Sequence, residues 1–549
     1  MNIASGKQNI GNKISLIILA LILFFLIVCP LAVLFLGNTQ WRVIFEDEKS
    51  KMILNSLLLG VYVVLGASII SFPLAFIFSR TNFARLKFFD IIFMIPFMTP
   101  PYIASMGWIL FMQKRGLLQQ ILPFTKGCEN IFFTPAGLVL VMSLHVFPFM
   151  YTMLKNAMLN IPQSLDEAGS VFGAGFFRRL RKINLPLLVG NYAIACLLVF
   201  VKTLSEYGTP ATLGKRIGFD VFTIQIHKYA TVAPVDFDKS ACLSSILALI
   251  CLLMWFSQNF ITEKNKWALV GSRGNRIYEK KLNSVSVILC SIFIAIVILF
   301  AIVIPYFSVI STSLIKLRGY GLKKGNFTFD NYINLFTENT KAIKALLNSL
   351  FLALTSATIC AVLGTSICIS VNNSKSKLKK VVEAISLLPE MLPGIVLVLG
   401  IMIFWNRLYK ILPLYNTMGI MVLAYTVLFL PYTIQYVNSS LSQLSSNLIA
   451  AGKISGASDF YILRKITIPL IFKGIMAGWM MTFIISFREL VTASLISPPN
   501  VLVVSTFIVR EFEQGSVSSG MAMAVICVLF TTTALLILNT VLNRSQNKK

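Results

Sequence analysis

Charged residues are scarce in this chain. They make up 13% of its 549 residues, which is about half the share found in a typical soluble protein. Hydrophobic residues make up 56%, and the mean hydropathy is +0.80. This composition excludes an ordinary soluble domain and predicts an all-α polytopic membrane protein. Acidic residues are the rarer charged kind, with 21 Asp and Glu against 48 Lys and Arg and a net charge of +27.

Patterns for binding metals or nucleotides, or for forming disulfides, are also missing. Most of the nine cysteines lie in apolar segments, and Cys128 stands alone in a loop. No Cys-x-x-Cys pair or Cys/His cluster occurs, so neither a zinc site nor a disulfide framework is predicted. Gly6 and Gly11 have the spacing of a phosphate-binding loop, but Asn12 and Lys13 follow where Lys and Ser or Thr are required. We expect no catalytic residue, no metal and no cofactor. Any ATP hydrolysis must then belong to a separate subunit.

Long apolar runs dominate what is present. Twelve segments are long enough to cross a bilayer, which takes about 20 residues. They fall into two halves of six: 14–36, 53–79, 89–113, 136–157, 188–208 and 239–260, then 285–310, 346–371, 382–405, 418–438, 470–490 and 519–542.

The positive residues orient these spans. Lys and Arg gather in alternate loops, and both termini fall on the same side as those loops. That side is predicted to be cytoplasmic. One outer loop, 311–345, is also rich in Lys, but long loops weigh less in this rule. The cations form no stripe with interleaved aromatics, so they predict membrane orientation and no nucleic-acid partner.

A polar stretch between apolar segments occurs twice. The first copy begins at Glu167 and the second at Ala450, and matched positions lie 283 residues apart. Asn55-Ser56-Leu57 recurs at 348–350 with an offset of 293, so the loop between the third and fourth spans is ten residues shorter in the second half. Fixed offsets mark an internal duplication. The predicted domains are a first repeat at 1–260, a flexible cytoplasmic linker at 261–284 and a second repeat at 285–549.

The repeated stretch resembles the EAA loop of type I ABC importer permeases. The family pattern is Glu-Ala-Ala, three residues, Gly, nine residues, Ile, one residue, Leu-Pro. In the first loop, 160–187, Gly169 replaces the second Ala; in the second, 443–470, Ala450 replaces the Glu and Ile468 the Leu. The residues that this resemblance assigns to ATPase coupling are Glu167, Ala168, Gly169, Gly173, Ala174, Ile183, Leu185 and Pro186, then Ala450, Ala451, Gly452, Gly456, Ala457, Ile466 and Pro469.

The resemblance implies a mechanism and a set of partners. In this family each loop forms a short helix, roughly parallel to the membrane, that fits a groove on an ATPase subunit. It implies two ATPase copies, an extracytoplasmic substrate-binding protein, the lipid bilayer, and a location in the inner membrane of a bacterium. The small residues permit close backbone approach. Because only the first copy keeps its Glu, at the positive end of the helix dipole, we expect unequal contributions from the two loops.

Two permease halves fused in one chain resemble the ferric iron branch of these importers. The segment Leu204-Ser205-Glu206-Tyr207-Gly208-Thr209-Pro210 is similar to that branch's Asp-Phe-Gly-Thr-Pro region. Fused halves also occur in thiamine importers, and related permeases carry aminoethylphosphonate, polyamines or sulfate. A secondary transporter with duplicated halves is another alternative, although it has no use for two matched EAA loops.

Ionisable residues within the apolar segments are the remaining candidates, because burying a charge in lipid is costly. Glu206 and Glu489 are equivalent and lie late in the fifth span of each half. Together with Glu390 they are predicted to line the translocation path or its gate. The alternative is an ion pair within the helix, because Lys202 precedes Glu206 by four residues and Arg488 adjoins Glu489.

Overall fold

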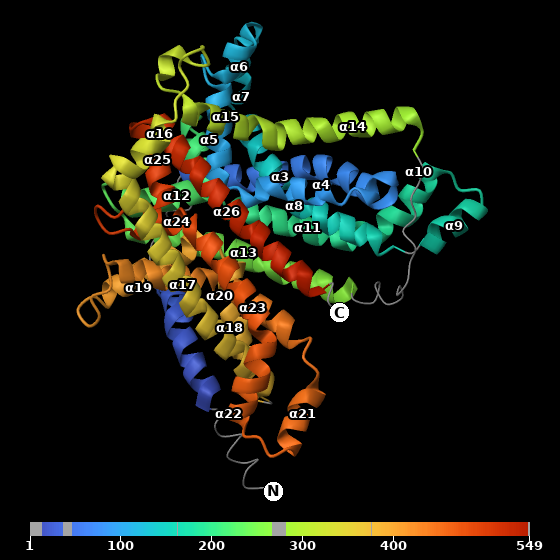
Figure 1. The fold of residues 1–549 in the computed structure, drawn as a ribbon, viewed down its shortest axis with the longest axis vertical. Coiled ribbons are helices and arrows are strands. Elements are labelled where there is room, and N and C mark those ends of the chain that lie inside the picture. Colours follow the sequence, from blue (N-terminus) through green and yellow to red (C-terminus); the bar gives the residue numbers. More distant parts are fainter. Residues whose placement is uncertain (1–13, 37–46, 162, 266–281, 375, 547–549) are drawn as a thin grey trace. The chain divides into compact units, whose positions relative to one another are not determined.

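The computed structural model describes residues 14–36, 47–161, 163–265, 282–374 and 376–546 (Figure 1). Within these ranges the regular structure is helical, apart from isolated bridge residues such as the antiparallel pair Ile315 and Phe327. Ten helices are long and apolar enough to cross a membrane, and two bent helix pairs bring the number to twelve if each pair is one span. The predicted all-α fold with about twelve spans is confirmed. Residues 266–281 of the predicted linker lie outside the described residues.

The helices pack as two compact units. Unit 1 comprises Met1–Trp41, Ile226–Ser245 and Tyr332–Lys549, and unit 2 comprises Arg42–Gln225 and Ile246–Asn331. These units differ from the sequence repeats. The first span of each repeat belongs to the unit that holds the core helices of the other repeat.

Unit 2 is built on three long helices, α3 (Asp47–Arg80), α8 (Pro135–Leu159) and α11 (Leu185–Ser205). Small residues bring α3 and α8 together. Gly66 faces the Ser143 side chain so closely that a Cβ at 66 would collide with it. The Ser71 hydroxyl donates to the Phe147 carbonyl at 2.9 Å, which ties the two helices together again.

The first span of the second repeat completes unit 2. It consists of α14 (Ser284–Ile298), a π-helical turn at Leu299–Val303, and α15 (Ile304–Leu314). α15 packs against α5 (Pro101–Met112). A Cβ at Gly107 of α5 would lie 2.5 Å from the carbonyl oxygen of Pro305, so glycine is required for this approach.

Unit 1 repeats the plan with α17 (Thr340–Asn373), α20 (Met418–Leu441) and α23 (Ile468–Phe487). Gly364 and Gly478 both pack against Thr433, whose hydroxyl lies 3.0 Å from that of Thr482. The first span of the chain ends in α2 (Cys29–Leu36), which packs on α19 (Gly394–Arg407). α26 (Val517–Gln546) packs against α23.

The third span of each repeat is broken. α4 (Phe88–Met98) and the helical segment after it differ in direction by 88°, and α18 (Leu378–Met391) and α19 by 111°. Pro100 and Pro393 stand at the breaks. Proline lacks an N–H and disfavours helical geometry in the residue before it, and Thr99 and Leu392 are accordingly extended. The predicted spans 89–113 and 382–405 are therefore bent pairs.

Candidate functional site

The two EAA-like loops fold alike, element by element. Each begins with a nine-residue helix, continues with a short helix and a π-helical turn, and runs into the fifth span. The boundaries in the second loop all lie 283 residues after those in the first. The elements are α9 (Gln163–Val171), α10 (Phe176–Arg179) and Leu180–Asn184, then α21 (Ser446–Ile454), α22 (Asp459–Ile462) and Leu463–Thr467.

A glycine in the left-handed conformation ends the first helix of each loop. Gly173 has φ +76° and Gly456 has φ +78°, values that glycine adopts without strain. The residue after each glycine donates its N–H back into the helix, Ala174 to the Gly169 carbonyl at 2.9 Å and Ala457 to the matching carbonyl at 3.1 Å. This is the hydrogen bond of a glycine-terminated helix end.

The turn folds the loop back onto its own helix. A Cβ at Gly169 would lie 2.9 Å from Cδ1 of Ile183, and one at Gly452 would lie 3.2 Å from Cδ1 of Ile466. The spacing between the small residues and the isoleucine in the repeated pattern therefore has a local cause. It closes a small packed unit within each loop.

The other predicted coupling residues lie on this scaffold. They are Glu167, Ala168, Ala450 and Ala451 on the first helices, and Leu185, Pro186 and Pro469 at the start of α11 and α23. The prolines are the second residues of α11 and α23, and each helix continues directly from the π-helical turn of its loop.

Equivalent apolar side chains remain exposed on the two loops. Val171 is 84% exposed and Ile454 is 87% exposed, and both stand at the last residue of their helices. Leu165 and Leu448, each six residues earlier, are also exposed. Contact with a partner surface would bury these side chains, and the coupling role of the loops stays a prediction.

The charges of the loops differ. Glu167 is exposed on α9, whereas the matched position in α21 is Ala450. The second loop instead carries an exposed ion pair between Lys453 and Asp459, with 3.6 Å between Nζ and Oδ1. The loops therefore share a backbone and present different electrostatic surfaces.

Glu206 and Glu489 hold equivalent turns just after the fifth span. Both oxygens of Glu206 accept the Thr209 N–H at 3.1 Å, and Oε1 of Glu489 accepts the Thr492 N–H at 3.0 Å. The backbone carbonyl of Glu206 in turn accepts the Thr223 hydroxyl at 3.0 Å. The structure brings these carboxylates to the N-terminal ends of short helical segments, and the assignment to the path stays a prediction.

The repeated Asn-Ser pair has a role that the sequence did not reveal. The Ser56 hydroxyl accepts the N–H of Phe222 at 2.9 Å, where α12 (Phe222–Thr231) begins. The Ser349 hydroxyl accepts the N–H of Val504 at 2.8 Å, where α25 (Val504–Gln514) begins. In both repeats a hydroxyl from the second span thus caps a helix that lies between the fifth and sixth spans.

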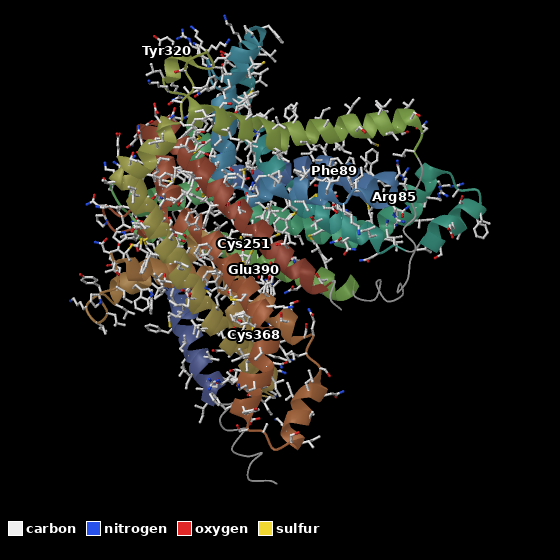
Figure 2. The ribbon with its side chains drawn as sticks, viewed as in Figure 1. Arg85, Phe89, Cys251, Tyr320, Cys368 and Glu390 are labelled. Atoms are coloured by element: carbon white, nitrogen blue, oxygen red, sulfur yellow. The ribbon has the colours of Figure 1, made fainter. Side chains whose placement is uncertain are left out.

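Glu390, labelled in Figure 2, is exposed near the end of α18. It has a hydrogen-bond partner on α20. Nε2 of Gln435 lies 2.5 Å from its Oε2 and donates a hydrogen bond to it. This third predicted path residue therefore belongs to unit 1, close to the break in the third span.

Comparison with known families identifies the chain. The model of binding-protein-dependent transport system inner membrane components matches residues 67–267 and 357–548. Together the two matches cover more than half of the chain, and each contains one EAA-like loop. The chain belongs to this family.

Relatives of this permease match both halves. It is 24% identical to the ferric transport system permease protein FbpB of Actinobacillus pleuropneumoniae, over 99% of this chain and 80% of that protein. It is 23% identical to the Fe(3+)-transport system permease protein FbpB 2 of Haemophilus influenzae, over 89% of this chain and 90% of that one.

Other matches cover about half of the permease. The spermidine/putrescine transport system permease protein PotC of Haemophilus influenzae is 27% identical over 44% of this chain and 92% of its own length. Among solved structures, a bacterial ABC transporter involved in the import of the acidic polysaccharide alginate covers 48% of this chain and 96% of its own, at 19% identity and a TM-score of 0.37.

Family membership fixes the class. The chain is the multi-pass, membrane-spanning permease component of a binding-protein-dependent ABC importer. It is a transport subunit whose family works with an ATPase and a substrate-binding protein.

Proposed function

We propose that this permease imports ferric iron and that its two loops couple it to two separate ATPase subunits, which hydrolyse the ATP. The observation that carries the coupling is the matched fold of α9 and α21, with an exposed apolar residue at the end of each. Similarity to ferric permeases over nearly the whole chain supports the substrate. Both loops and both termini are placed on the cytoplasmic side by the positive-inside rule.

The first loop has a stiff connection to the kinked third span. α8 leads directly into α9, and its last turns are held from two sides. Nζ of Lys155 lies 2.6 Å from both carboxylate oxygens of Asp90 on α4. Arg80 donates to the carbonyl of Met158 at 2.8 Å and to that of Ile161 at 3.3 Å. A displacement of α9 by an ATPase would therefore move α8 and α4 together.

The implied cycle is alternating access. A loaded binding protein docks on the outer face, ATP closes the ATPase dimer, and the loops pass that closure to the broken spans. The breaks at Pro100 and Pro393 supply points where the third spans can change angle.

Uptake of labelled ferric iron, in cells with and without this gene, tests the proposal. Thiamine, putrescine and aminoethylphosphonate are measured in parallel, with putrescine prompted by the half-chain match. We expect loss of iron uptake alone, and the same loss when the ATPase subunit is disabled. If uptake of another solute is lost while iron uptake is unchanged, that solute would replace ferric iron as the proposed substrate. If no solute shows an ATP-dependent loss of uptake, the alternative of a secondary transporter would have to be considered again.

A further inference from the structure

Two connections lie together at one end of unit 2. They are residues 113–134, which follow α5, and residues 315–331, which follow α15, and we call them the outer platform. α5 and α15 pack against each other through Gly107, so the chain leaves both helices in one place. Figure 1 shows α6 (Leu117–Ile121) and α7 (Cys128–Phe132) of the first connection beyond α15.

Within unit 2, the outer platform lies at the end of α8 opposite the first loop. α8 begins at Pro135, directly after the first connection, and ends at Leu159, shortly before α9. Its 25 residues span about 37 Å, enough to cross the hydrocarbon core. With α9 in the cytoplasm, the platform faces the extracytoplasmic side.

Hydrogen bonds join the two connections. Oε1 of Gln120 accepts the N–H of Leu322 at 2.9 Å, and Arg318 donates to Oε1 of Gln113 at 3.1 Å. Gly321 has φ +57° and lies against the Gln120 side chain, where a Cβ would collide. The two segments therefore form one surface, although about 200 residues of chain separate them.

The second connection is also ordered within itself. The side-chain amide of Asn326 donates to the carbonyls of Leu317 and Gly321 at 2.8 Å, and its oxygen accepts the Leu317 N–H at 2.9 Å. The Thr328 N–H donates to the Leu314 carbonyl at 2.8 Å. Tyr320 marks this loop in Figure 2.

Positive charge dominates the platform. Seven exposed cations stand against two carboxylates, a net charge of +5: Lys114, Arg115, Lys126, Lys316, Arg318, Lys323 and Lys324 against Glu129 and Asp330. Glu129 serves the fold of its own loop, since it accepts hydrogen bonds from Gln119 and Gly127. The hydrogen bond from its own N–H, together with these two, holds the pKa of Glu129 below its usual range.

Unit 1 has a much smaller counterpart. The connection between α5 and α8 has 22 residues, whereas 408–417, between α19 and α20, has ten. The offset between the repeats changes from 293 to 283 in this connection. The Lys-rich loop 311–345, which departs from the positive-inside pattern, contains the second connection of the outer platform. An outer face that gathers cations against this pattern calls for an anionic partner.

We propose that the outer platform is a docking surface for an acidic face of the extracytoplasmic binding protein. The proposal rests on the proposed function, because a binding-protein-dependent importer must receive a protein on this face. The hydrogen-bonded scaffold presents the cations in a fixed arrangement, which shape-specific docking to a protein uses and attraction to anionic lipid does not need. Such rim charges act mainly on encounter rate and salt dependence.

The test uses the full complex, permease with ATPase, in vesicles of pure phosphatidylcholine. The binding protein is the one that supports uptake in cells, and the readout is the concentration that gives half-maximal stimulation of the ATPase. Lys316→Glu/Lys323→Glu/Lys324→Glu should raise that concentration about tenfold and weaken its salt dependence. The matched control reverses three exposed lysines outside the platform: Lys228→Glu/Lys341→Glu/Lys410→Glu should shift it less than about twofold.

A second variant tests the platform without changing charge. Gln120→Ala removes one of the two hydrogen bonds that join the connections. It should raise the half-maximal concentration about threefold, consistent with the loss of about one hydrogen bond. Equal concentrations for wild type and the triple platform variant would overturn the proposal. So would a defect seen only when phosphatidylglycerol is present, because the occupant would then be anionic lipid. If no binding protein stimulates ATP hydrolysis by the wild-type complex, the proposed function would be overturned, and the proposed docking surface with it.

Discussion

At the scale of single residues, the glycines that end α9 and α21 explain the repeated pattern better than small size does. The sequence predicted small residues for close approach to a partner. In the structure, Gly173 and Gly456 have positive φ, and a Cβ at either would meet nothing within 4 Å. A side chain there is therefore opposed by backbone strain and not by crowding within the chain.

Gly173→Val should lower uptake about tenfold, because a β-branched residue in the left-handed region costs about 1–2 kcal/mol and the helix end would rearrange. Gly173→Asn should stay within about twofold of wild type, since Asn tolerates this conformation. Gly456→Val should have a smaller effect than Gly173→Val, because only the first loop keeps its Glu. Uptake is measured at matched permease levels in the membrane.

Gly218→Val is the control for that series. Gly218 also has positive φ with open space around it, and it follows the end of α11 that lies away from the first loop. Gly218→Val should introduce the same backbone strain as Gly173→Val, but it should leave uptake unchanged. Equal losses for Val and Asn at position 173 would contradict the conformational account and favour close approach to the ATPase.

The half-buried turns at Glu206 and Glu489 pose a second question at this scale, because each carboxylate serves either the fold or the translocation path. Glu206→Gln keeps an oxygen that can accept the Thr209 N–H and removes the charge. If the charge lines the path or gate, uptake should fall at least about tenfold while the permease stays folded. Glu489→Gln tests the same point in unit 1.

The matched comparison at this turn is Glu206→Ala, which removes both the charge and the acceptor. Glu206→Ala should lower the free energy of unfolding by about 1–3 kcal/mol, whereas Glu206→Gln should leave it unchanged. Normal uptake by both Gln variants would limit the two residues to their structural role.

At the scale of elements, hydropathy and the duplication predict most of the architecture. The twelve apolar segments, the two loops and the equivalence of Gly173 and Gly456 follow from the sequence and are found in the structure. The bends are less accessible, because Pro100 removes an N–H but does not set an angle of 88°. The Ser56 cap could not be predicted, because its partner at Phe222 lies 166 residues away and only the folded chain brings the two together.

Ser56→Ala should loosen the start of α12, because it leaves the N–H of Phe222 without its cap acceptor at a cost of about 1 kcal/mol. Amide hydrogen exchange in the first turn of α12 should then be about fivefold faster, the factor that matches that free energy. Ser349→Ala should do the same for α25. Ser366→Ala is the control, because that hydroxyl bonds only within its own helix in the described contacts, to the Val362 carbonyl at 2.7 Å. Unchanged exchange in both capped helices would remove the proposed role of the repeated Ser.

At the scale of the whole molecule, the packing crosses the sequence repeats. Residues 14–36 contact helices of the second repeat, as in the 2.9 Å contact between the hydroxyls of Ser15 and Ser370 and the packing of α2 on α19. Residues 284–314 contact α5 of the first repeat. The first span of each repeat therefore packs against helices of the other repeat. A search for repeats cannot detect this exchange, because a duplicated sequence shows the order of the spans and not their packing partners.

This exchange predicts how the chain behaves when it is cut. Pieces 1–265 and 282–549, expressed together, should co-purify and transport, because each lacks its full set of neighbours alone. Deletion of 14–36 should make the helices of unit 1, α17 to α23, sensitive to protease while α3, α8 and α11 stay resistant. Deletion of 284–314 should do the reverse. Limited proteolysis with mass spectrometry reads out both, and protection that follows the sequence repeats instead of the units would contradict the exchange.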